Sequence, residues 1–296
     1  MSHPTPIRGL GPDSRLTDAA RRLLTGRLTD VRLAREGLDA EFGMDAVHDV
    51  RVATRRLRAA LHLFRDLGEL APLEKDVKHL QDALGEVRDL HVQGDWLSQS
   101  ASKARGARGT GYTALGTQVT APLGQKERRL KTALKRWDER TVPAIEDAAE
   151  HLEGPGRYGG KRVRKLLRRR LRSLHALMKD YAHAPDAQTA HEMRKTVKKL
   201  RYEAELFRPA RGREMKTLQK ELEPLQEVLG ELHDADVRLD LLEHLATKAR
   251  GARRTAAREL LERVREERET QATHTARELE RWHSERVTHG LKQLLA

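Results

Sequence analysis

The residues with the strongest chemical signal are a histidine and a row of arginines in HDVRVATRRLRAALHLF, residues 48–64. At 100° per residue, the apolar side chains fall on one side of a helix and the basic side chains on the other. Residues 48–65 carry five Arg and one Asp, whereas an ordinary solvated helix face mixes charges of both signs. Arg can donate two hydrogen bonds at once to a phosphate, so the pattern favours an anion-binding face over a solvated one.

The same pattern recurs 143 residues later in HEMRKTVKKLRYEAELF, residues 191–207. LQDALGEVRDLHV (80–92) likewise matches LQEVLGELHDADV (225–237), and KARGAR occurs identically at 103–108 and 248–253. This collinear order predicts a tandem duplication with a two-residue insertion in the second copy. Because the basic face persists in both copies, binding is a better explanation for it than solvation.

A helical frame is predicted for the whole chain. Alternating β-branched and aromatic residues, which would indicate strands, are nearly absent. Helices are expected at 14–40, 45–67, 71–101 and 117–150 in the first half and at 160–182, 186–209, 212–249 and 253–294 in the second. Four amphipathic helices per half predict an all-α fold of two four-helix bundles.

Clusters of proline and glycine mark the predicted domain boundaries. EGPGRYGG (153–160) is the clearest helix-breaking cluster and predicts a linker between a first bundle at 14–152 and a second bundle at 161–296. Residues 1–13 hold three Pro and two Gly, and disorder is expected there.

The loops inside the two halves are expected to differ. GARGTGYTALG (106–116) predicts a flexible loop, whereas its counterpart at 251–260 has lost most of the glycines and predicts helix. For the repeated KARGAR block, a tight turn at Gly106 and Gly251 is favoured over an accessory anion contact.

Composition limits the chemistry. The 296 residues carry 58 Lys+Arg and 45 Asp+Glu, a net charge of +13, which favours an anionic partner. The absence of cysteine excludes disulfides, Cys-ligated zinc and thiol catalysis. Neither a glycine-rich nucleotide motif nor His-Glu-x-x-His occurs, so no catalytic residue, metal site or cofactor is predicted. Secretory signals and apolar runs of ~20 residues are also missing, so we expect a cytoplasmic protein without membrane contact.

The pattern His-x-x-Arg-x-x-x-(Arg/Lys)-(Arg/Lys)-Leu-Arg at 48–58 and 191–201, with LG…D…V at 84–92 and 229–237, resembles the conserved histidine α-helical domain (CHAD) family. The resemblance covers almost the whole chain. It implies two four-helix bundles related by a pseudo-twofold axis, a central basic groove or pore, and binding of inorganic polyphosphate, with a role at polyphosphate granules. The Glu-x-Glu-x-Lys signature of the hydrolase domain that some family members carry is absent, which favours a protein that is not an enzyme.

The resemblance assigns polyphosphate binding to His48, Arg51, Arg55, Arg56 and Arg58 and to His191, Arg194, Lys198, Lys199 and Arg201. Lys195 joins the second set because it lies beside the basic stripe. Paired basic positions predict second-tier contacts at Arg21, Arg22, Arg27, Arg164, Lys165 and Arg170. His62 and Arg88 are not included among the predicted contacts, because the second copy has Glu205 and His233 at the matching positions and so does not repeat these residues.

Alternative interpretations stay open. Binding to a nucleic-acid backbone would use the same charge, but aromatic residues make up only 3% of the chain, too few for extensive stacking on bases. A scaffold that docks an acidic protein partner is a third interpretation, and each histidine could instead serve as a capping or packing residue.

The length of the basic stripe favours polyphosphate. A stripe from His48 to His62 is about 21 Å long at ~1.5 Å per residue, which suits a chain of several phosphates. The oligomeric state is left open.

Overall fold

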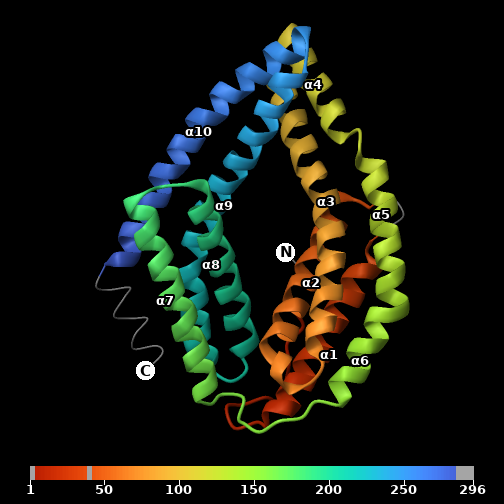
Figure 1. Cartoon of the computed structure of the whole chain (residues 1–296), viewed down its shortest axis with the longest axis vertical. Helices are drawn as coiled ribbons and strands as arrows, with labels where there is room; N and C mark the ends of the chain where they lie inside the picture. The colour runs from red at the N-terminus through yellow and green to blue at the C-terminus, as the bar shows by residue number, and fades with distance from the viewer. Residues whose placement is uncertain (1–3, 39–41, 285–296) are drawn as a thin grey trace. The chain divides into compact units, whose positions relative to one another are not determined.

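The computed structural model describes residues 4–38 and 42–284, apart from the side chain of Arg162 (Figure 1). Every regular element in these ranges is a helix, and an isolated β-bridge joins Arg15 to Arg157. The prediction of an all-α fold is confirmed.

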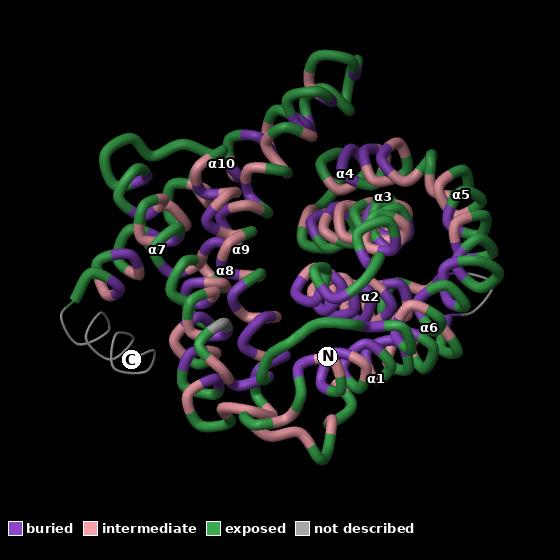
Figure 2. Tube along the Cα trace, turned by 60° about the horizontal axis from the view of Figure 1, so that its bottom comes forward, coloured by how far each residue is buried: buried purple, intermediate pink, exposed green. Residues whose placement is uncertain are grey.

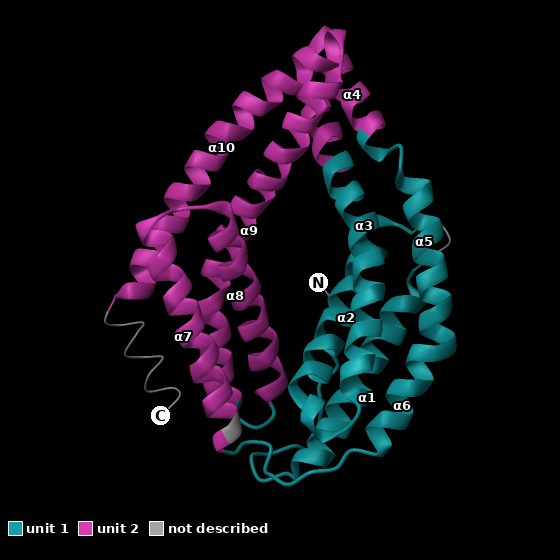
Figure 3. Cartoon of the chain, in the orientation of Figure 1, with its two compact units in different colours: residues 1–94, 119–160, 209–211 teal, residues 95–118, 161–208, 212–296 magenta. Residues whose placement is uncertain are grey.

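The chain divides into two compact units (Figure 3). Unit 1 comprises residues 1–94, 119–160 and 209–211, and unit 2 comprises residues 95–118, 161–208 and 212–296. The change from unit 1 to unit 2 after residue 160 coincides with the end of the predicted linker. The other boundaries differ from a division into two successive halves, because 95–118 groups with unit 2.

Unit 1 is formed by α1 (Leu16–Glu36), α2 (Met44–Phe64), the 3₁₀ turn η1 (Arg65–Leu67), most of α3 (Leu70–Ser102), α5 (Leu123–Arg136), the π-helical turn η2 (Trp137–Thr141) and α6 (Val142–Glu150). α1 packs against both α2 and α6. Leu24, Val50, Leu57 and Ile145 are fully buried among these helices. Their burial follows the apolar side of each amphipathic pattern.

The N-terminal segment packs along α1. The amide of Thr5 donates to Oδ1 of Asp30 (3.0 Å). Gly26 leaves room for Ile7, because a Cβ atom at Gly26 would lie 2.2 Å from Ile7 Cδ1. These contacts place Thr5 and Ile7 against α1, which differs from the disorder expected for the N-terminal segment. Its first three residues lie outside the described ranges.

The predicted linker also packs on unit 1. Tyr158 is completely buried, and its amide donates to the carbonyl of Ser14 (3.0 Å). The amide of Gly159 donates to the carbonyl of Pro12 (2.8 Å). The segment that leads into unit 2 is therefore held by backbone hydrogen bonds to the start of the chain.

Unit 2 is formed by most of α4 (Ala107–Thr120) with α7 (Lys161–His183), α8 (Ala187–Phe207), α9 (Gly212–Lys248) and α10 (Gly251–His283). α7 packs on α8, α8 on α9, and α9 on α10 as a long hairpin (Figure 1). Leu167, Val197, Leu229 and Val264 are buried between these helices. Figure 2 shows buried stretches recurring at intervals along the helices, as amphipathic packing requires.

The end of α3 joins unit 2 through side-chain contacts. In α4, the next helix after α3, Arg108 pairs with Glu259 of α10 (Nε to Oε1, 2.6 Å). Arg263 of α10 donates to Oγ of Ser100 on α3 (2.9 Å). Residues 95–118 therefore belong with the α9–α10 hairpin although they precede the predicted linker.

The prediction of a flexible loop at 106–116 is wrong, because most of this segment forms α4. Tyr112 and Leu115, three residues apart, are both buried. Their packing within unit 2 outweighs the low helix propensity of the neighbouring glycines.

The helix expected at 117–150 is interrupted by two prolines. Pro122 lies between α4 and α5, at the N-cap of α5. Pro143 has no N–H to donate within a helix, and the turn just before it is π-helical: the amide of Val142 bonds the carbonyl of Trp137, five residues back. The helix predicted at 117–150 is therefore divided among the end of α4, α5 and α6. Its counterpart in the second half, α10, runs unbroken over Gly251–His283.

The KARGAR blocks form turns in both halves. Gly106 has φ +60° and Gly251 has φ +56°, in the left-handed region that glycine adopts without steric cost. The prediction of a tight turn is confirmed at both positions.

Candidate anion-binding faces

In unit 1 the predicted residues lie on α2. Val50 and Leu57 are buried on one side of the helix, which directs the basic residues to the other side. His48, Arg51 and Arg55 are partly exposed there, spaced by about one helical turn. The α2 face is defined as His48, Arg51, Arg55 and Arg58.

α3 supports the α2 face from the side. The guanidinium group of Arg51 rests against Gly85, where an added Cβ atom would lie 3.8 Å from Arg51 Nε. Arg88 donates from Nη1 to the carbonyl of Met44 at the start of α2 (3.0 Å). Arg88 therefore adds charge next to the predicted residues, although the comparison of the two halves excluded it.

His48 is shifted towards the neutral form. Its pKa is lowered mainly by burial and then by the positive charge of Arg88, with smaller effects of Arg51 and Arg55 in the same direction. Asp49 opposes the shift. A neutral imidazole donates one hydrogen bond, and a bound anion would favour the charged form.

The C-terminal end of the α2 face contains an acidic residue. Arg58 donates from Nη1 to Oε1 of Gln81 (3.3 Å), and its Nε lies 3.3 Å from Oε1 of Glu74. Nδ1 of His62 lies 3.1 Å from the other oxygen of Glu74. Glu74 therefore offsets positive charge at this end, and the most cationic part of the face lies nearer to His48.

In unit 2 the matching residues lie on α8. Met193 and Val197 are buried, and His191, Arg194 and Lys198 are partly exposed on the opposite side. The α8 face is defined as His191, Arg194, Lys198 and Arg201. Its spacing repeats that of the α2 face, as the sequence predicted.

The first turn of α8 is capped. Oδ1 of Asp186 accepts a hydrogen bond from the amide of Thr189 (2.8 Å), an N-cap that sets where the helix begins. Hydrogen bonds from Thr189 are also the main reason that the pKa of Asp186 is lowered. Lys195, another predicted contact, pairs with Glu192 (2.5 Å), so part of its charge is offset within the helix.

α9 places a second histidine beside the α8 face. The rings of His191 and His233 have their centroids 5.0 Å apart. Burial, followed by the charges of Arg194 and His191, lowers the pKa of His233 to about 4. The pKa of His191 is also lowered, again mainly by burial. Unit 2 thus has two neutral imidazoles where unit 1 has His48 and Arg88.

The flanks of the two faces differ. Arg56 is only 6% exposed, although it is rotated from His48 by the same angle of about 80° as Lys199 is from His191, so its surroundings and not its helical position account for the burial. Its counterpart Lys199 keeps an exposed surface, while partial burial of the ammonium group and the nearby Arg170 lower its pKa. Lys199 is therefore exposed on unit 2, whereas Arg56 is buried in unit 1.

One shared feature was missed by the sequence reasoning. Arg201 donates from Nη1 to Oε1 of Gln226 (2.9 Å), and Arg58 bonds Gln81 in the same way. Both glutamines follow a leucine at the start of the matched LQ blocks, so their repetition was the available signal. Because glutamine is neutral, it orients each guanidinium group without removing its charge.

Two second-tier residues make contacts at the edge of unit 1. Arg21 donates to the carbonyls of Ala149 (3.2 Å) and Glu150 (3.3 Å), the last residues of α6, where a cation is favourable. Arg22 donates to the carbonyl of Arg8 (3.3 Å). Both have structural roles within unit 1.

The other second-tier residues separate into two groups. Arg27 is buried, pairs with Asp30 (3.3 Å) and bonds the carbonyl of Thr5. Arg170 pairs with buried Glu203 (3.1 Å). Arg164 and Lys165 instead line a hollow on α7.

Two other kinds of site are absent from the described residues. No helix there combines the length and apolarity that a membrane span requires. No group of three or more His, Asp or Glu side chains there is placed to hold a metal ion.

Comparisons with known proteins agree with this architecture. A family model described as CHAD domain matches residues 22–243. The crystal structure of the CHAD domain from the plant Ricinus communis has a TM-score of 0.65 and 23% identity, covering 99% of this chain and 96% of that chain. PptA from Streptomyces chartreusis has a TM-score of 0.65 and 18% identity, covering 90% and 100%. These two likenesses show the fold. No curated protein matches the chain.

Proposed function

Because this chain belongs to the CHAD domain family, we propose that it binds inorganic polyphosphate through the α2 and α8 faces and does not hydrolyse it. The observation that carries the proposal is the repetition of one arrangement in both units. Each face has a neutral histidine, an arginine one turn later, a further cation after another turn, and an arginine held by a glutamine. Internal packing of a helix does not require this set.

Binding is electrostatic. The planar guanidinium groups donate paired hydrogen bonds to phosphate oxygens, and lysine adds point charges. Aromatic residues make up only 3% of the chain, which suits a ligand that has phosphates but no bases to stack on. Affinity should fall steeply as salt rises, because binding releases counterions; for duplex DNA the log–log slope is about −0.9 per neutralised phosphate. In the cell, we place the protein in the cytoplasm at polyphosphate granules.

The test is isothermal titration calorimetry with size-defined polyphosphate at two salt concentrations. The variant Arg51→Ala/Arg55→Ala/Arg194→Ala/Lys198→Ala should bind at least about a hundredfold more weakly, because each charge-assisted contact contributes roughly 1 kcal/mol or more. A matched control removes four exposed cations elsewhere: Lys131→Ala/Arg140→Ala/Lys216→Ala/Lys220→Ala. The control should bind nearly as the native chain does.

Three outcomes would contradict the proposal. Equal losses in both variants would mean that net charge alone attracts the ligand. Displacement of polyphosphate by excess single-stranded or duplex nucleic acid would favour a nucleic-acid ligand. Release of inorganic phosphate during incubation with polyphosphate would show hydrolysis.

A further inference from the structure

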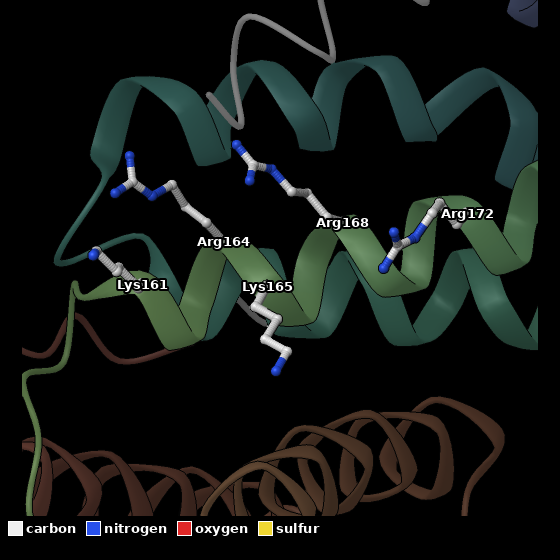
Figure 4. A pocket seen from close by; sticks show the side chains of 5 residues that line it. All are labelled: Lys161, Arg164, Lys165, Arg168 and Arg172. Atoms are coloured by element: carbon white, nitrogen blue, oxygen red, sulfur yellow. The ribbon is translucent and has the colours of Figure 1, made fainter.

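Unit 2 carries a second basic surface. Five cations of α7 line one hollow of about 430 Å³ (Figure 4): Lys161, Arg164, Lys165, Arg168 and Arg172. This set is called the α7 hollow. Two of the five were second-tier predictions, and the other three became apparent from the structure.

Helical geometry brings these residues together. They follow one another at intervals of one, three or four residues, which keeps them on one side of α7. Figure 4 shows Arg164 and Arg168 extending from the same side of the helix. From Lys161 to Arg172 the row is about 16 Å long at ~1.5 Å per residue. It therefore offers several cations to one extended ligand.

The α7 hollow is separate from the α8 face. Leu167 and Leu171 are buried and mark the side of α7 that faces the interior of unit 2. Arg170 projects on one flank of that side, where it pairs with Glu203 of α8. At 100° per residue, Arg168 projects about 160° away from Arg170, on the opposite flank. A ligand on the α8 face would not occupy this hollow.

The charge of α7 is unusual for the start of a helix. The first turn of α7 has no acidic residue, although cations near a helix N-terminus are unfavourable, as are like charges one turn apart. α1 forms the matching helix of the first half with Asp18 at the position of Lys161 and Thr25 at the position of Arg168. The extra charge at these two positions thus belongs to the second half alone.

We propose that the α7 hollow is an additional binding site for a linear, phosphate-rich anion, with polyphosphate as the ligand. The identity of the anion rests on the proposed function, whereas the site itself does not. Arginine forks and lysine ammonium groups supply the donors that phosphate oxygens accept. The lining contains no aromatic residue, so it favours phosphates over the bases of a nucleic acid.

The test compares the native chain with three variants by calorimetry, using short, size-defined polyphosphate. Lys161→Gln/Lys165→Gln/Arg168→Gln/Arg172→Gln removes four of the five cations of the α7 hollow, and the alanine variant of the α2 and α8 faces keeps all five. The control, Lys216→Gln/Lys220→Gln/Arg254→Gln/Arg258→Gln, removes four exposed cations from α9 and α10. The native chain should show two classes of site. The α7 variant should lose one class, by about tenfold or more in affinity; binding equal to that of the control would overturn the inference.

A second measurement needs no variant of α7. In the alanine variant of the α2 and α8 faces, polyphosphate should protect Lys161 and Lys165 from acetylation, read by mass spectrometry, while Lys216 stays reactive. Unprotected Lys161 and Lys165 would overturn the inference, as would stronger protection by a single-stranded oligonucleotide. If the alanine variant binds polyphosphate as the native chain does while the α7 variant fails to bind it, the α2 and α8 faces are not the site of the proposed function and the α7 hollow is.

Discussion

Arg201 of α8 donates a 2.9 Å hydrogen bond from Nη1 to Oε1 of Gln226 on α9. Arg58 of α2 bonds Gln81 of α3 with the same atoms at 3.3 Å. A carboxylate at these positions would cancel the charge of the arginine, as Glu74 partly does beside Arg58. A neutral amide instead holds the guanidinium group in place and leaves it cationic.

The glutamine contact predicts a graded effect on polyphosphate binding. Gln226→Leu should weaken binding about threefold to tenfold, since one hydrogen bond worth roughly 1 kcal/mol no longer orients Arg201. Gln226→Glu should weaken binding more, because it neutralises the arginine as well. Calorimetric titration would measure both, with Gln219→Leu, two turns earlier on α9, as the matched control. Native affinity in Gln226→Glu would contradict the orienting role.

His233 predicts a pH dependence of stability. Its pKa is about 4 in the folded chain, and the unfolded chain takes up the proton near the ordinary value of 6.5. The free energy of unfolding should therefore decrease as pH falls from about 6.5 towards 4, by up to ~1.4 kcal/mol per pH unit for this one proton. Urea unfolding at pH 7 and pH 5 would measure the decrease.

A substitution isolates the contribution of His233. His233→Arg, which introduces the residue that unit 1 has at Arg88, should reduce the pH dependence, and His244→Arg, at an exposed position of α9, is the matched control. A bound polyanion favours the imidazolium form of His233. The affinity for polyphosphate should therefore rise as pH falls over the same range, and binding should be accompanied by proton uptake. An identical pH dependence in His233→Arg and the native chain would show that other groups cause it.

Glu203 predicts a large loss of stability when its charge is removed. It is 5% exposed, pairs with Arg170 (3.1 Å), and lies near Lys199, where it opposes the lowering of the Lys199 pKa that burial mainly causes. Glu203→Gln would leave two cations without this carboxylate in a partly buried place, at a cost of about 2–4 kcal/mol in the free energy of unfolding. Urea denaturation would measure the loss against Glu223→Gln, an exposed position on α9. Equal stabilities would mean that the pair contributes nothing.

Gly26 predicts an unusual response to alanine. In an open helix, Gly→Ala stabilises by roughly 0.5–1 kcal/mol. Here the new Cβ atom would lie 2.2 Å from Ile7 Cδ1, so Gly26→Ala should give no gain or a loss. The double variant Gly26→Ala/Ile7→Ala should recover the stabilisation relative to Ile7→Ala alone. Thermal unfolding of the four proteins would show whether the N-terminal segment packs on α1.

Periodicity in the sequence was enough to predict most of the helices and the side of the helix from which the main basic residues project. His48 and Arg51 face away from Val50 and Leu57 because helical spacing sets the side from which each residue projects. Repetition of the same spacing identified the α8 face in the same way. These features depend on near neighbours in the chain.

Contacts between distant segments determined the remaining features. Arg56 is buried while its counterpart Lys199 is displayed. The segment at 106–116 is helical because unit 2 buries one side of it, and Arg170 is engaged by a glutamate 33 residues away. Burial and pairing are properties of the surroundings that other helices create, and no local pattern encodes which helix supplies the partner. The same is true of Gln226, whose role becomes visible when α8 and α9 pack together.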